Sequence, residues 1–287
     1  MNTRITTLLL TGAVLIAGAY AAVGAHSSAV ADEPTARTAV KPPPPPPPAG
    51  SPNGPQAGSF RVDCAPSKVA AVDPIVMPGH TGMSHMHQFF GNRSINENST
   101  AASLRATPAT SCRNAADASA YWVPTLLNNG VAVNPITLEV LYRKTVNTPV
   151  VAHPAGLMLI AGSSKATAAQ STAIISWSCT GSNAPGTATP SVCRNRQQLV
   201  AQIRYPECWD GKNLDSADHK SHVSYAANGV CAAGTVALPQ IEMRVIYPRI
   251  ANVSSLSLSS GSIFSMHADF FNGWDQRRFA GMVGRLN

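Results

Sequence analysis

Three short pairs of ionisable residues are the most promising chemical groups in this sequence. They are His85 and His87 in SHMHQFFG, His219 and His222 in DHKSH, and His267 and Asp269 in MHADFFNGWD. Imidazole and carboxylate groups bind metals and transfer protons near neutral pH. We therefore predict one polar site that is assembled from three distant segments of the chain.

The first and third pairs have the spacing of a β-strand. Alternate side chains of an extended strand point to the same face, so His85 and His87 would converge, and His267 and Asp269 would converge likewise. The alternative is that these histidines are hydrogen-bonded structural groups, because an HxH spacing by itself is a weak motif.

The second pair has a different geometry, because His219 and His222 are three residues apart. Such side chains come together only on a turn or a short helix. With the strand pairs they could supply three or four nitrogen ligands and a carboxylate, which suits zinc or copper with one open position. The predicted metal ligands are His85, His87, His222 and His267.

A long polar segment at residues 204–225, with the end of the chain, supplies further candidates. The candidate acids and bases are Asp210 and Asp215, and the candidate substrate contacts are Trp209, Trp274, Asp275 and Lys220. A glycosidase needs two carboxyl groups about 5 Å or about 6.5–9.5 Å apart, and flat rings bind sugars. The alternative is that these aspartates form turns and that these tryptophans belong to the core.

The N-terminal residues indicate export and a spacer. Arg4 precedes an apolar run at residues 8–23 and then small residues, which is typical of a signal peptide, here assigned to residues 1–31. The run is also near the lower length limit of an uncleaved membrane anchor. Residues 32–59 contain a proline run from Pro42 to Pro48 and form an extended linker. One β-rich domain at residues 60–287 follows, and we expect it to be secreted, associated with the cell wall and monomeric.

Charge and cysteine content narrow the setting of this domain. Residues 60–287 carry 18 basic and 12 acidic side chains, a net charge of +6, and the basic residues are scattered along the sequence. This pattern does not favour nucleic acid as a partner. An even number of cysteines in an exported chain favours disulfides. Closure of the shortest loops predicts the pairs Cys64–Cys112, Cys179–Cys193 and Cys208–Cys231.

The residue pattern predicts a mainly β fold. Short runs of β-branched and aromatic residues alternate with turn residues, and Ile136, Leu138, Val140 and Tyr142 alternate with a second face in one such run. We predict an antiparallel two-sheet sandwich of the jelly-roll type with long disulfide-bonded loops. The segments 191–204 and 115–120 are the best candidates for one or two short helices.

Four strings give the chain a family resemblance. DPIVMPGHTGMSHMHQFFG, YWVPTLLNNG, YPECWDGKNLDSADHKSHVSY and HADFFNGWD resemble a secreted family of fungi and actinobacteria known as a domain of unknown function, number nineteen ninety-six. The resemblance spans residues 62–275. It implies an exported protein that works near polysaccharide, and it brings no activity and no catalytic residues.

Two functional hypotheses use the same residues. In the first, the domain is an enzyme that acts on an extracellular or cell-wall polysaccharide, either with the histidines alone or with a metal that they hold. In the alternative, it is a non-catalytic carbohydrate- or metal-binding domain of the cell surface. Hydrolysis of nucleic acid is a third and weaker hypothesis, because the sequence has no dense basic run.

Overall fold

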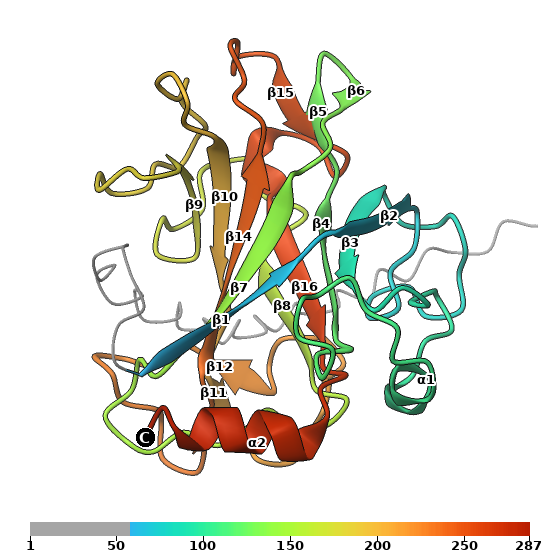
Figure 1. Ribbon diagram of the computed structural model, residues 1–287, viewed down its shortest axis with the longest axis vertical. Coiled ribbons are helices and arrows are strands. Elements are labelled where there is room, and N and C mark those ends of the chain that lie inside the picture. The colour runs from blue at the N-terminus through green and yellow to red at the C-terminus, as the bar shows by residue number, and fades with distance from the viewer. Residues whose placement is uncertain (1–57) are drawn as a thin grey trace, which may run out of the picture. The chain divides into compact units, whose positions relative to one another are not determined.

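A computed structural model describes residues 58–287, all of which belong to one compact unit (Figure 1). The predicted signal peptide and nearly all of the predicted linker lie outside the described residues. The first strand begins at Ser59, next to the predicted start of the domain. The described part is mainly β, with antiparallel sheets and few short helices, as predicted.

The first large sheet has five antiparallel strands. In spatial order they are β1 (Ser59–Cys64), β7 (Thr137–Arg143), β14 (Gln240–Tyr247), β10 (Leu199–Arg204) and β9 (Ile175–Cys179). Strand β7 buries every second residue, which is the consequence of the alternation in its sequence. The expected strand pattern is confirmed for this segment, apart from the exposed Ile136 that precedes it.

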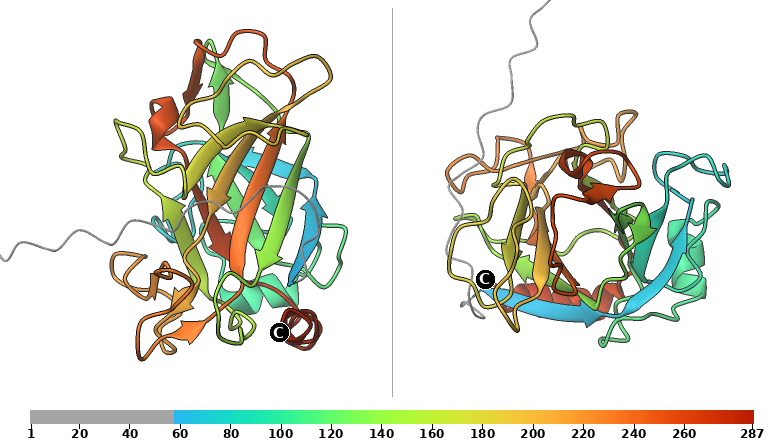
Figure 2. Two further views of the ribbon diagram at one scale, coloured as in Figure 1. Left: turned by 90° about the vertical axis from the view of Figure 1, so that its left-hand side faces the viewer. Right: turned by 90° about the horizontal axis from the view of Figure 1, so that it is seen from above.

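The second large sheet also has five antiparallel strands. Its spatial order is β2 (Pro66–Ala70), β3 (His87–Gly91), β4 (Ala120–Pro124), β16 (His267–Phe271) and β8 (Met158–Gly162). Ala65 alone separates β1 from β2, so the chain passes directly from one sheet to the other (Figure 2). Every residue of β3, β4 and β16 is buried, because both faces of these strands are covered.

The two faces of the second sheet contribute to different clusters. Tyr121 and Phe270 belong to the larger core, which they share with residues of the first sheet such as Val140. On the opposite face, Trp122 packs in a smaller cluster with Leu104 from helix α1 (Ala101–Ala106). Side chains that alternate along β3 and β16 therefore point either into the core between the sheets or to this outer face.

Smaller elements complete the fold. The remaining short elements are β11 (Cys208–Trp209), β12 (Val223–Ser224), β13 (Val236–Ala237), β5 (Leu126–Asn128), β6 (Val131–Ala132), β15 (Leu256–Leu258), the 3₁₀ helix η1 (Ile263–Ser265) and helix α2 (Gln276–Gly284). Among residues 58–287, no helix is long and apolar enough to cross a bilayer.

The disulfide prediction is confirmed. The pairs are Cys64–Cys112, Cys179–Cys193 and Cys208–Cys231, and together they include all six cysteines. The third bridge holds one end of the long polar segment against the body of the domain. Bridges of this kind restrict the unfolded chain and favour the folded state.

The two helix predictions are wrong. Residues 191–204 end in strand β10, whose Leu199, Val200 and Ile203 are buried between β9 and β14. A central strand that is covered on both faces has a continuous apolar run, and such a run is easily mistaken for a helix. Residues 115–120 form a turn that leads into β4, while the helices lie at Ala101–Ala106 and Gln276–Gly284.

Candidate functional site

The site begins with one row of residues across the second sheet. His87 of β3 pairs with Pro124 of β4, and Asp269 of β16 pairs with Trp122 of β4. Continued by two residues, this register places His267 beside Pro124 as well. The imidazoles of His87 and His267 therefore flank the same proline, and their ring centroids are 5.8 Å apart. Both histidines point to the outer face of the sheet.

His85 completes the group from the loop just before β3. Its ring centroid lies 4.2 Å from that of His87 and 5.0 Å from that of His267. One ligand atom from each of these three histidines lies within 4.8 Å of the others. We call His85, His87 and His267 the histidine cluster. The predicted convergence of two distant segments is found here in the arrangement of the rings.

Hydrogen bonds orient two of the three imidazoles. His87 Nδ1 lies 2.8 Å from the carbonyl oxygen of Val72, and His267 Nδ1 lies 2.8 Å from that of Ser265. A carbonyl only accepts, so each Nδ1 donates and each Nε2 keeps its lone pair. The Nε2 atoms of His85 and His87 are buried and have no hydrogen-bond partner among residues 58–287. Histidines that bind metals are commonly oriented in this way.

Burial keeps the cluster uncharged. It lowers the pKa of His85, it lowers that of His87 well below the usual value, and it lowers that of His267 to about 4. Electrostatic repulsion within the cluster adds to this effect at His87 and His267. Three neutral imidazoles therefore meet at neutral pH, and their lone pairs are available without loss of a proton.

Asp269 is the carboxyl group next to the cluster. Its Oδ2 lies 3.9 Å from His267 Nε2, and neither carboxylate oxygen has a hydrogen-bond partner within the described residues. Its neighbours within the sheet, Trp122 on β4 and Ile160 on β8, are apolar. Burial raises the pKa of Asp269 well above its usual value, the nearby Asp73 adds to the rise, and Lys220 opposes it. A cation beside Asp269 would offset the free-energy cost of burying its carboxylate.

A pocket of about 490 Å³ opens onto this group. Besides His85, His267 and Asp269, its polar lining includes Asp73, Asp218, His219 and Lys220. Lys220 donates from Nζ to the carbonyl oxygen of Gly162. Gly162 lies on β8 and pairs with His267 of β16. The pocket thus joins the outer face of the second sheet to the long polar loop.

Of the two histidines predicted from the long polar loop, His219 lines the pocket and His222 does not. His219 lies at the pocket, and its Nδ1 is 2.8 Å from a carboxylate oxygen of Asp215. His222 lies outside the cluster, with Nε2 bonded to the carbonyl oxygen of Met158 and Nδ1 bonded to Ser216. Both ring nitrogens of His222 are therefore occupied, and we remove this residue from the set of metal ligands.

Two predicted carboxylates have local structural roles. Asp210 is half-buried and accepts hydrogen bonds from the backbone N–H groups of Lys212 and Asn213, as a turn residue does. Asp275 caps helix α2 through the backbone N–H of Arg278. Neither Asp210 nor Asp275 lines the pocket at the histidine cluster.

The prediction that Trp209 and Trp274 contact a substrate is wrong for Trp274. Trp274 is fully buried and donates from Nε1 to the hydroxyl oxygen of Tyr142, so its ring is not available to a sugar. Trp209 is half-buried, and its Nε1 donates to the carbonyl oxygen of Asn213. The large aromatic rings of this domain serve mainly the core.

Sequence reasoning missed Asp73 as a member of the site. Asp73 accepts hydrogen bonds from the backbone N–H groups of Ile75 and Val76, as a turn residue does. It also lines the pocket and interacts electrostatically with His219 and Asp269. The DP dipeptide signals the turn, and no local pattern indicates that the turn faces a distant strand.

The family model described as domain of unknown function, DUF1996, matches residues 73–274. The chain belongs to this family. The match begins at Asp73 and includes the whole histidine cluster and Asp269, so the pocket of this DUF1996 domain is built within the family's own segment. No curated protein and no solved structure matches the chain.

Proposed function

We propose that this DUF1996 domain binds one divalent metal, zinc or copper, through His85, His87 and His267, and uses it to hydrolyse an extracellular polysaccharide. The observation that carries the proposal is the convergence of three imidazoles, with two buried Nε2 atoms that have no partner among the described residues. Imidazole nitrogen suits both metals, and copper would bind more tightly than zinc to the same site.

The proposed centre is open and not closed. Structural zinc sites have four protein ligands, whereas catalytic sites have three and keep a position for water or substrate. Here three histidines converge beside a pocket of about 490 Å³, which leaves room for that position. A bound metal would supply a water of lowered pKa as the nucleophile.

Asp269 is the proposed proton-transfer group. Its buried carboxyl group holds its proton more tightly than an exposed one, and it lies beside His267 at the floor of the pocket. Beside a bound metal its carboxylate form would be stabilised, so it would accept a proton from the metal-bound water and then donate that proton to the leaving sugar oxygen. Lys220 and Asp73 line the same pocket and are the proposed contacts to the substrate.

The polysaccharide assignment is supported by the setting and by the polarity of the pocket. Three disulfides are typical of an oxidising, extracellular environment. Within the described residues, histidine is the sole aromatic type that lines the pocket. This favours a site that holds one polar sugar unit by hydrogen bonds over a site that stacks a sugar on a flat ring.

Metal content is the first test. The full chain, purified without a histidine tag and incubated with zinc or copper, should retain one metal per chain when it is measured by mass spectrometry. His87→Gln or His267→Gln should weaken metal binding by at least about 100-fold. His80→Gln is the matched control, because His80 is exposed and lies outside the cluster. Retention of no metal by the parent chain would refute the proposal.

Product release is the second test. A panel of cell-wall polysaccharides should give new reducing ends with the metal-loaded chain, fewer after EDTA treatment, and very few with Asp269→Asn. Unchanged product after EDTA would refute the metal's role in the reaction. Stoichiometric metal binding without product from any polysaccharide would favour the alternative of a non-catalytic metal-binding domain.

A further inference from the structure

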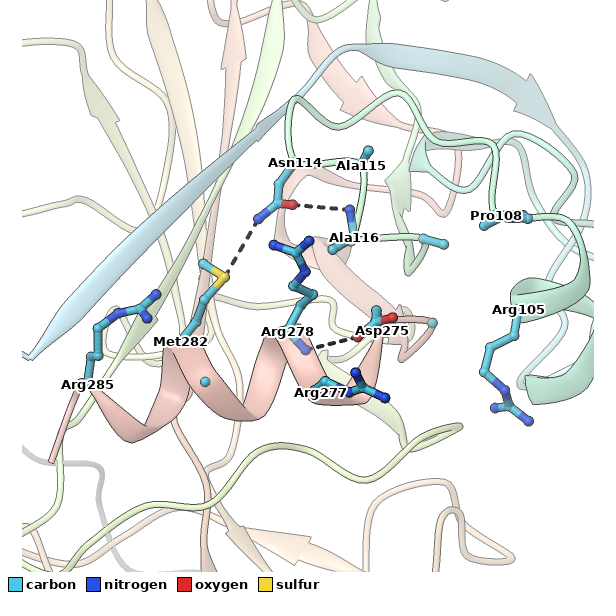
Figure 3. A pocket seen from close by; sticks show the side chains of 13 residues that line it. Arg105, Pro108, Asn114, Ala115, Ala116, Asp275, Arg277, Arg278, Met282 and Arg285 are labelled. Atoms are coloured by element: carbon cyan, nitrogen blue, oxygen red, sulfur yellow. Dashed lines mark hydrogen bonds between the residues drawn. The ribbon is translucent and has the colours of Figure 1, made fainter.

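A second pocket lies where the chain leaves β16 and enters helix α2. It has a volume of about 830 Å³ and is lined by Arg105 from α1, by Arg277 and Arg278 from α2, and by Arg285 at the C-cap of α2 (Figure 3). Arg105 is more than 170 positions from the others in the sequence, so this convergence is a product of the fold.

The four guanidinium groups have no ion pair and no hydrogen bond among residues 58–287, and all four arginines are exposed. By contrast, three arginines of the first sheet are paired: Arg204 and Arg143 contact Glu242, and Arg244 contacts Glu139. The arginines of the second pocket are therefore fully available to a ligand.

The rest of the pocket lining contributes little opposing charge. Asp275 is the single acidic residue in the lining, and it already accepts a hydrogen bond from the backbone N–H of Arg278. Four arginines and one aspartate give the lining a net charge of 4 − 1 = +3. Ala115, Ala116 and Gly281 have small side chains or none, which leaves the space between the arginines open.

We propose that this arginine pocket binds the carboxylate groups of an acidic polysaccharide. The planar guanidinium fork matches a carboxylate with two parallel hydrogen bonds, which a lysine cannot make. Arg278 in α2 and Arg285 at the C-cap of α2 are seven residues apart, about two turns or 10 Å along the helix axis. Cations so spaced, in a pocket of about 830 Å³, suit a polymer with repeated charges better than one small anion.

This inference is independent of the proposed reaction. The arginine pocket includes Gly273, just beyond β16, whereas the histidine cluster uses His267 at the start of β16. From His267 to Phe271 the strand rises by about 13 Å, and Gly273 lies beyond its far end. Polymer binding and metal binding can therefore be measured separately.

Binding to polygalacturonate tests the proposal, with the full chain kept in EDTA so that metal plays no part. The parent chain should be retarded by polygalacturonate in affinity electrophoresis and not by neutral dextran of similar length, and added salt should weaken the binding. Arg277→Gln/Arg278→Gln should weaken it at least about tenfold.

The matched control is Arg194→Gln/Arg196→Gln, which removes two exposed arginines that do not line the pocket. It should bind polygalacturonate nearly as the parent does. Absence of retardation of the parent chain would overturn the inference, as would an equal loss in both double variants, since an equal loss would mean that net charge alone drives the binding.

Discussion

The histidine cluster and His153 are two regions with buried imidazoles and different surroundings. His153 is fully buried, neither ring nitrogen has a hydrogen-bond partner among the described residues, and burial lowers its pKa to about 3. Its ring stacks on Phe279 and lies near Tyr142 and Phe270. An unpaired, buried imidazole is therefore common to both regions and does not identify a site.

The difference between the regions lies in what else converges there. At the cluster, three imidazoles meet, two have their Nδ1 atoms bonded to backbone carbonyls, and the carboxyl group of Asp269 lies beside them at a pocket. Around His153 the neighbours are aromatic rings of the core. Convergence of ligand atoms on an open pocket distinguishes a candidate metal centre from an imidazole that only fills space.

The largest effect should come from replacement of His153. Its pKa is about 3 when folded, against 6.5 when unfolded, so the unfolded chain binds the proton more readily between these values. Stability is then complete above pH 6.5 and falls as the pH decreases toward 3. His153→Leu should remove this dependence, on the order of 4 kcal/mol across the window.

Urea unfolding at several pH values measures this effect. EDTA keeps the chain free of metal, so loss of metal in acid does not contribute to the change in stability. His80→Leu is the control for the substitution itself, because His80 is exposed. If the stability of His153→Leu falls with acid as steeply as that of the parent, His153 is not the buried neutral group described here.

Asp269 should have a smaller effect on stability, with the opposite dependence on pH. Burial and the nearby Asp73 raise the pKa of Asp269, so its contribution to stability is lost as the pH rises from about 4 toward neutrality. Asp269→Asn should therefore stabilise the metal-free chain at pH 7. With zinc bound, the variant lacks the attraction between carboxylate and metal, so zinc should raise its Tm by less than half as much as in the parent.

Thermal unfolding with EDTA and with excess zinc gives both numbers for each chain. Asp215→Asn is a suitable control, because Asp215 bonds to His219 and does not belong to the lining of the pocket. An equal zinc-induced rise in Tm for parent and Asp269→Asn would show that Asp269 does not face the metal.

The smallest effect should come from Lys220. This cation lines the pocket and interacts unfavourably with protonated His267. Lys220→Met should therefore strengthen zinc binding by about two- to fivefold at low salt, and less at high salt. Lys212→Met, in the same loop and outside the pocket, should leave zinc affinity unchanged in a competition titration. Weaker zinc binding by Lys220→Met would contradict this account.

Several features of the fold could be predicted because local patterns determine them. The alternation of Leu138, Val140 and Tyr142 specifies a strand with one buried face, and pairing of cysteines that are consecutive in the sequence matches the three disulfides. The HxD spacing likewise predicted that His267 and Asp269 share a face of a strand, whereas His85 of the HxH spacing lies in the loop before β3. These predictions depend on residues that are near one another in the sequence or, for the cysteines, on pairing between consecutive ones.

Other features depend on long-range packing and could not be predicted. Pro124 separates His87 from His267 in the sheet only because β4 lies between β3 and β16. The role of Asp73 and the gathering of Arg105 with the arginines of α2 depend in the same way on the tertiary fold. Trp274 has the sequence context of an exposed platform, and its burial follows from packing against Phe279.

Anomalous diffraction at the zinc absorption edge, from crystals of the zinc-loaded chain, tests the central claim most directly. We expect one strong peak within coordination distance of nitrogen atoms of His85, His87 and His267, beside the pocket that Asp269 lines. A zinc peak elsewhere in the domain, or no peak at these histidines in a zinc-loaded crystal, would contradict it.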